Sequence, residues 1–233
     1  MRKALLAATA LVGSVIFLVP GAQAFDWNGR YVGGVVGIVK STGSIDFEYF
    51  PIAGGPDSIE FDGIGGLAGI TWGFNYKLSD KMVVGVEADA SVASLKSSAS
   101  GSNFDFPPWI GEFEETLESL LTLRGRLGAL SPDGNTLFYA TAGLAGGQVT
   151  LRSFIDNGIG PEPIAATTSG FAIGLIGGVG IEHAIKDDLT VKAEILAYQL
   201  GSLSGIGDIG KGEFEATHNP SGIIFRTGLN FHF

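Results

Sequence analysis

The residues best placed to do chemistry lie close together near the end of the chain. His218 and Ser221 are near neighbours, and Glu213 and Glu215 lie just before them. Serine hydrolases pair a serine nucleophile with a histidine base and a carboxylate that orients the imidazole. Small polar residues in a loop also produce such neighbours by accident. We therefore expect a protein that is not an enzyme, with hydrolysis at His218 as the minor alternative.

The sequence supports a metal, nucleotide or nucleic-acid site no better than it supports a hydrolase site. The chain has 3 histidines, none paired at ligand spacing, and no cysteine, so no ligand set can be recognised. Residues 205–210 match G-x-G-x-x-G, and residues 63–68 match its alanine variant, but neither stretch has the strand–turn–helix setting that a dinucleotide needs. A net charge of −10 argues against nucleic acid. We expect no metal, no cofactor and no nucleic-acid partner.

Charged residues within the alternating segments of the chain share one phase of the alternation. The opposite phase is apolar, and in the first segment it holds Tyr31, Val35 and Val39. Turning a cation towards lipid near the bilayer midplane costs about 2–4 kcal/mol. We therefore expect the charged phase to lie inside a barrel and the apolar phase to face lipid. The predicted lumen residues are Arg30, Glu87, Asp89, Arg124, Arg126, Glu182, Lys192, Glu194 and Arg226.

Those side chains need strands to position them. The sequence contains eight alternating segments, which are residues 27–39, 62–76, 82–95, 119–130, 137–151, 169–184, 189–200 and 222–233. Most exceed the roughly 9–11 residues that a tilted strand needs to cross a bilayer. Connections 77–81, 131–136 and 185–188 are short, whereas 40–61, 96–118, 152–168 and 201–221 are long. The sequence therefore predicts an all-β fold: an eight-stranded antiparallel up-and-down transmembrane β-barrel with three short periplasmic turns and four long outer loops.

The start of the chain has the pattern of a targeting segment. Arg2 and Lys3 precede an apolar run that ends before Pro20, and a small-residue site ends at Ala24. A basic, then an apolar, then a small-residue region is typical of a secretory signal peptide. We expect residues 1–24 to be removed by cleavage between Ala24 and Phe25, and residues 25–233 to form the outer-membrane barrel.

The predicted lumen set contains both signs of charge. An eight-stranded barrel is only wide enough for side chains to fill its interior. Opposite charges packed there should pair, because an unpaired buried charge is strongly destabilising. We expect a structural ionic network that closes the barrel. A conducting polar pore is the alternative.

The long connections carry many acidic and aromatic residues, such as Glu112, Glu114 and Phe113. Exposed aromatic side chains rimmed by acidic ones suit contact with a partner. The strands could equally continue beyond the membrane, with these aromatic side chains packed on each other. Both alternatives stay open at this point.

Several stretches resemble one known family. Trp27-Asn-Gly-Arg-Tyr-Val-Gly-Gly, Gly85-Val-Glu-Ala-Asp89 and Arg226-Thr-Gly-Leu-Asn-Phe-His-Phe233 are similar to strands of small porin-like outer-membrane β-barrel proteins of Gram-negative bacteria, with an OmpA-like or opacity-type eight-stranded barrel. The resemblance covers the chain after Ala24. It implies location in the cell outer membrane, contact with outer-membrane lipid, and recognition of the last strand, with Phe231 and Phe233, by the barrel-assembly machinery.

From these observations we expect a structural role in envelope integrity, or a surface-interaction role through the long acidic loops and a partner that they bind. A small-solute porin is the first alternative, as the resemblance to porin-like proteins suggests. A lipid-modifying enzyme of the outer membrane is the second.

Overall fold

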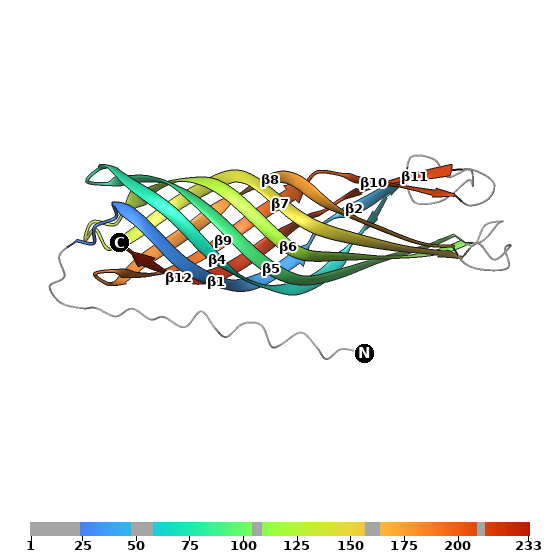
Figure 1. Cartoon of the computed structure of the whole chain (residues 1–233), viewed down its shortest axis with the longest axis horizontal. Helices are drawn as coiled ribbons and strands as arrows, with labels where there is room; N and C mark the ends of the chain where they lie inside the picture. The colour runs from blue at the N-terminus through green and yellow to red at the C-terminus, as the bar shows by residue number, and fades with distance from the viewer. Residues whose placement is uncertain (1–23, 48–57, 104–108, 157–163, 209–212) are drawn as a thin grey trace.

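The computed structural model describes residues 24–47, 58–103, 109–156, 164–208 and 213–233 (Figure 1). Eight antiparallel strands form a closed ring in the order β1-β12-β9-β8-β7-β6-β5-β4, which confirms the predicted barrel. A separate 4-stranded sheet has the order β10-β11-β2-β3. Among the described residues, no helix is long and apolar enough to cross a membrane. The strands are β1 (Gly29–Ser41), β2 (Ser44–Phe47), β3 (Ser58–Glu60), β4 (Asp62–Ser79), β5 (Met82–Asn103), β6 (Trp109–Leu130), β7 (Thr136–Asp156), β8 (Ile164–Lys186), β9 (Leu189–Leu200), β10 (Leu203–Asp208), β11 (Glu213–Asn219) and β12 (Ser221–His232).

The ring closes between its first and last strands. β1 pairs with β12 from Tyr31 opposite His232 to Ser41 opposite Gly222, and with β4 on its other side. Short connections join β4 to β5, β6 to β7 and β8 to β9, as predicted. The chain ends beside these connections, at what we call the turn end of the barrel (Figure 1). An even number of up-and-down strands requires this placement.

The opposite end differs from the prediction, because much of the expected loop sequence is strand. β5, β6, β7 and β8 continue beyond the ring as one arm, the β5–β8 arm. The 4-stranded sheet forms a second arm, the β2–β11 arm, made of β2, β3, β10 and β11. Figure 1 shows the two arms separating away from the barrel. Phe113, expected in a loop, is 2% exposed within β6, so at this residue the strand continues and the aromatic side chain packs inside.

The inward phase of β1 also differs from the prediction. Tyr31, Val35 and Val39 are buried inside the barrel, whereas Arg30 is exposed on the outside. Directly opposed residues of paired strands share a face, and Tyr31 lies opposite the buried His232. Arg30 is beside the turn end, where a long cationic side chain can reach water without entering the lumen. The prediction that Arg30 belongs to the lumen network was wrong.

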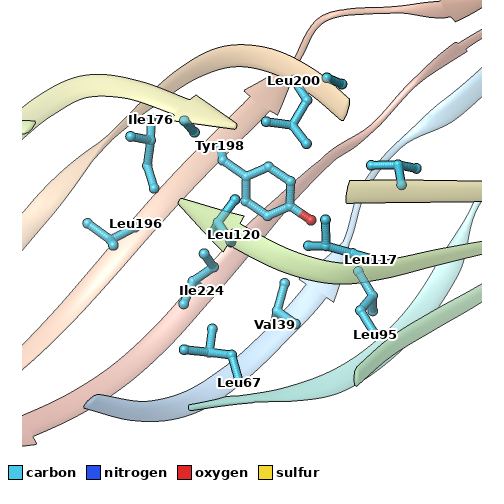
Figure 2. Close-up of a cluster of buried hydrophobic side chains, with 13 residues drawn as sticks. Val39, Leu67, Leu95, Leu117, Leu120, Ile176, Leu196, Tyr198, Leu200 and Ile224 are labelled. Carbon is cyan, nitrogen blue, oxygen red and sulfur yellow. The ribbon is translucent and has the colours of Figure 1, made fainter. Parts of the chain in front are cut away.

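Side chains fill the barrel interior in three zones between the turn end and the arms. The charged residues occupy the middle zone. An apolar cluster fills the zone nearest the arms (Figure 2). The zone at the turn end contains Phe25, Trp27, Val83, Leu137 and Tyr139.

Candidate functional site

Arg124 on β6 is the centre of the charged zone, and its guanidinium contacts three carboxylates. The N–O distances are 2.7 Å to Asp89 and 3.0 Å to Glu194, and the third partner is Glu87. Glu87 lies directly opposite Arg124 in the β5–β6 pairing, so that contact follows from strand register. Glu194 reaches Arg124 from β9, which does not pair with β6. The interior is therefore narrow enough for side chains to bridge it.

Three further cations complete the network. Lys192 Nζ lies 2.8 Å from Glu87, Arg226 Nε lies 2.7 Å from Glu194, and Arg126 Nη2 lies 2.8 Å from Glu182. The four carboxylates thus face four cations, and this balance offsets the penalty of removing each charge from water. Apart from Arg30, the structure brings all the predicted lumen residues together: Glu87, Asp89, Arg124, Arg126, Glu182, Lys192, Glu194 and Arg226.

Uncharged side chains outside the predicted lumen set also bind these carboxylates. The Tyr31 hydroxyl donates to Glu87 at 2.7 Å, and the Thr122 hydroxyl donates to Asp89 at 2.6 Å. Thr122 lies directly opposite Asp89 on the neighbouring strand. Such residues can be predicted only from the strand register, because they carry no charge that marks them as inward-facing. Two further donors, both to Glu182, are Thr190 and Asn230.

The interior between the charges and the arms is apolar, which the sequence analysis did not predict. Figure 2 shows side chains of this zone pointing towards one another, and every strand of the ring contributes. Leu95, Leu117 and Leu196 are each at most 1% exposed. The pairing register of β6 shifts between Leu117 and Ser119, so that Leu117 and Leu120 both face inwards. Apart from the Tyr198 hydroxyl, the side chains of this cluster are apolar, and such a filled apolar zone disfavours water and ions.

His218, the candidate general base, is fully buried at the base of the β2–β11 arm. Its Nε2 atom lies 2.6 Å from a carboxylate oxygen of Glu115 on β6, and its Nδ1 atom lies 3.3 Å from the carbonyl oxygen of Ser44. The hydroxyl of Ser221 lies 3.2 Å from that of Thr42 instead. The contacts of the described residues therefore do not join Ser221 to His218 as nucleophile activation requires.

Glu115 was missed by the sequence analysis, which placed it in a loop. It accepts a hydrogen bond from the Ser97 hydroxyl at 3.4 Å, and it joins the β5–β8 arm to His218 on the β2–β11 arm. The side chains of Glu213 and Glu215, the predicted carboxylate partners, lie outside the described residues. The expectation that the protein is not an enzyme stays a prediction.

The outer wall of the ring is lined by large apolar side chains. Ile70 is 68% exposed, Leu175 66% and Trp72 51%, values that only a surrounding apolar phase would cover. Phe231 and Phe233, at the end of the chain, are 48% and 65% exposed on the same outward phase. Their recognition by the assembly machinery stays a prediction.

A family profile described as "Outer membrane protein beta-barrel domain" matches residues 7–233. The chain belongs to this family. It is therefore an integral outer-membrane β-barrel protein of the Gram-negative type, and its apolar outer wall contacts membrane lipid.

Individual proteins give the same assignment to this outer-membrane barrel. The chain is 27% identical over 242 residues to the 31 kDa outer-membrane immunogenic protein of Brucella melitensis, covering 99% of this chain and 96% of that protein. The outer membrane protein OprG from Pseudomonas aeruginosa superposes with a TM-score of 0.53 at 12% identity, over 91% of this chain and 100% of that one. The outer membrane protease OmpT from Escherichia coli superposes with a TM-score of 0.50 at 11% identity, over 91% of this chain and 99% of that one. At these low identities, the two superpositions show only that this chain has the same fold as OprG and OmpT.

Proposed function

We propose that this outer-membrane barrel does not conduct solutes and serves as a structural anchor that holds its two arms at the cell surface. The observation that carries the proposal is the filled interior. Four buried carboxylates and four buried cations contact one another in the middle zone, and a separate apolar zone follows towards the arms. A solute would have to separate the ion pairs and then cross the apolar zone.

The arms supply the part of the protein that can meet a partner. Phe154 is 39% exposed on β7, in a shallow groove of about 570 Å³ that Glu112, Glu114 and Arg152 also line. Arg152 lies 4.0 Å from Glu114, a distance at which exposed charges contribute little to stability. Their presence beside an exposed aromatic ring supports contact with another molecule.

The comparison with the Brucella protein supports surface exposure as well. That protein is named for being immunogenic, and the chain matches it along nearly its whole length. In barrels of this kind the short turns face the periplasm and the longer connections face outwards. The arms would accordingly lie outside the cell, where antibodies and other macromolecules reach them.

Cysteine labelling of intact cells tests this orientation. The chain has no cysteine, so one introduced thiol is a unique label. We expect Ser100→Cys, on the exposed face of the β5–β8 arm, to react with a large maleimide polymer that cannot cross the outer membrane. Asp80→Cys, in the β4–β5 turn, is the matched control and should react only after the outer membrane is permeabilised. Labelling of Asp80→Cys but not Ser100→Cys in intact cells would refute the orientation.

A liposome-swelling assay tests the absence of transport. Liposomes that contain the folded protein should swell in small sugars and amino acids no faster than protein-free liposomes. Swelling that depends on solute size would instead assign the protein to the porin alternative.

A further inference from the structure

The residues that precede β1 are buried inside the turn end of the barrel. Trp27 is 0% exposed and Phe25 is 7% exposed. Aromatic residues at the end of a transmembrane strand are expected at the membrane surface, yet here both rings enter the lumen. We call Phe25, Asp26 and Trp27 the N-terminal seal.

The N-terminal seal is held by hydrogen bonds to one turn. The Trp27 indole N–H donates to the carbonyl oxygen of Gly134 at 2.9 Å, and the backbone nitrogen of Phe25 donates to the Asn135 side-chain oxygen at 3.1 Å. Both acceptors lie in the connection between β6 and β7, more than 100 residues away in sequence. A buried indole N–H needs an acceptor, and because the carbonyl oxygen of Gly134 supplies it, the contact fixes where the Trp27 ring lies.

Ring contacts carry the seal across to the last strand. The Phe25 ring meets the Trp27 ring edge-on at 4.9 Å and the His232 ring edge-on at 4.9 Å. The His232 ring stacks on Tyr31 at 5.2 Å. Tyr31 binds Glu87, so the seal is linked to the charged zone through the rings of His232 and Tyr31. Aromatic pairs of this geometry contribute beyond the area that they bury.

The β6–β7 turn has its own internal hydrogen bonds. Ser131 N–H donates to the carbonyl oxygen of Thr136 at 2.8 Å, and Gly134 N–H donates to that of Ser131 at 2.9 Å. Gly134 has a φ of 74°, a conformation that favours glycine. Hydrogen bonds from the Ser131 hydroxyl and the Asn135 backbone lower the pKa of Asp133. The turn therefore presents its acceptors as a formed site.

We propose that the β6–β7 turn is a binding site for the amino terminus created when the bond between Ala24 and Phe25 is hydrolysed. A signal peptidase would add one water across this peptide bond, leaving a carboxylate on Ala24 and an amine on Phe25. An α-amino group has a pKa of about 7.7–8.0, so most of it is an ammonium at neutral pH. The amide N–H that now donates to Asn135 becomes a charged donor, and charged donors bind more strongly than neutral ones.

The surroundings leave room for that group. A pocket of about 470 Å³ adjoins Ala24 and Phe25 at the turn end. It has charges of both signs, so Asn135 supplies the specific acceptor and the pocket supplies no strong net field. The charged residues that line it are Lys77, Asp80, Lys81 and Asp133. This inference goes beyond the proposed function, since the seal would form whether or not the barrel conducts.

Fluorescence quenching of Trp27 tests the site. Replacing Trp72 and Trp109 by phenylalanine leaves Trp27 as the single tryptophan. Protein that begins at Phe25, made by precise removal of a fusion tag, should shield Trp27 from acrylamide. Protein that begins at residue 22 keeps the amide at Phe25 and carries its terminal amine three residues earlier, on Ala22. The longer form keeps only a neutral donor to Asn135, and a neutral donor binds less strongly than a charged one. A difference of about one net hydrogen bond corresponds to roughly a ten-fold rise in the unseated population, so the longer form should be quenched more.

Asn135→Ala in the protein that begins at Phe25 removes the acceptor altogether, so quenching should rise at least as much. Asp187→Ala in the β8–β9 turn is the control that should leave quenching unchanged. A heat-dependent gel shift verifies that each form is folded, and the comparison of two chain lengths does not depend on any variant at Asn135. Equal quenching of the two lengths would overturn the proposal. Trp27 that is freely quenched in the protein beginning at Phe25 would also overturn it, as would an intact mass showing that the protein from native membranes starts elsewhere.

Discussion

Replacing Arg124 by methionine removes one charge from the centre of the buried network while keeping most of the side-chain length. Arg124 contacts Glu87, Asp89 and Glu194, so the variant leaves four buried carboxylates with three cations. Removing one partner of a buried ion pair costs about 3–5 kcal/mol. This is a large part of the roughly 5–15 kcal/mol that stabilises a folded domain.

The contacts that remain decide where in this range the loss falls. After Arg124→Met, Glu87 keeps Lys192 at 2.8 Å, and Arg226 stays 2.7 Å from Glu194 and 3.2 Å from Asp89. Each carboxylate still has a cation, so we expect a loss near the lower end, about 3 kcal/mol. Adding Glu194→Gln restores the balance of charge and should recover part of it, within the roughly 0.5–3 kcal/mol range of coupled neighbours.

Urea unfolding of the refolded protein in lipid vesicles measures these differences. Arg30→Met is the matched control, because Arg30 is exposed and should change the free energy of unfolding by no more than about 0.5 kcal/mol. Equal effects of Arg124→Met and Arg30→Met would refute the reasoning. The reasoning would also be refuted if adding Glu194→Gln lowered the stability of Arg124→Met by the full cost of a second broken ion pair.

Three further substitutions test the packing. Gly73→Ala would place a methyl group inside the ring of Tyr31, and we expect urea unfolding to show a loss of about 1–3 kcal/mol from overpacking. Leu120→Ala, in the apolar zone, should cost about 2–5 kcal/mol by leaving a cavity, clearly more than Leu121→Ala on the lipid face. His218→Ala removes the contact between the arms, so hydrogen exchange should quicken in β2 and β11 while β12 stays protected.

Controls separate these effects from general damage. Gly34 faces outwards, and a Cβ there would make only an ordinary contact, 3.9 Å from the carbonyl oxygen of Gly69, so Gly34→Ala should leave stability within about 0.5 kcal/mol. A similar loss from Gly34→Ala and Gly73→Ala would contradict the packing of Tyr31. Equal losses from the two leucine variants would contradict a filled apolar zone. Unchanged exchange in β2 after His218→Ala would show that Glu115 does not hold the arms together.

The ring could be predicted from the sequence because charge and alternation point the same way in most strands. Glu87, Arg124 and Lys192 lie near the middle of long segments, where a wrong phase would turn a charge to lipid. A strong penalty therefore fixes which side faces inwards. The short turns were equally clear, since residues 131–136 combine Pro, Asp, Gly and Asn.

The parts that were missed depend on register, which one strand alone does not reveal. Arg30 lies beside a strand end, where the penalty for facing outwards is small, so its charge was a poor guide to the phase of β1. The pairing of Tyr31 with His232 decides that phase. Glu115 lies beyond the register shift in β6, so extrapolating the alternation from Arg124 could not place it inside. The burial of Trp27 could not be predicted either, because its acceptor, Gly134, is distant in the chain.

Single-channel recording is the most direct test of the closed interior. Residues 25–233 would be refolded, checked for folding by a heat-dependent gel shift, and inserted into a planar bilayer. A lumen filled by ion pairs and an apolar zone predicts no current steps from inserted protein. Steady and reproducible current that changes when Arg124 or Arg126 is neutralised would contradict the closed barrel and make the lumen a conducting path.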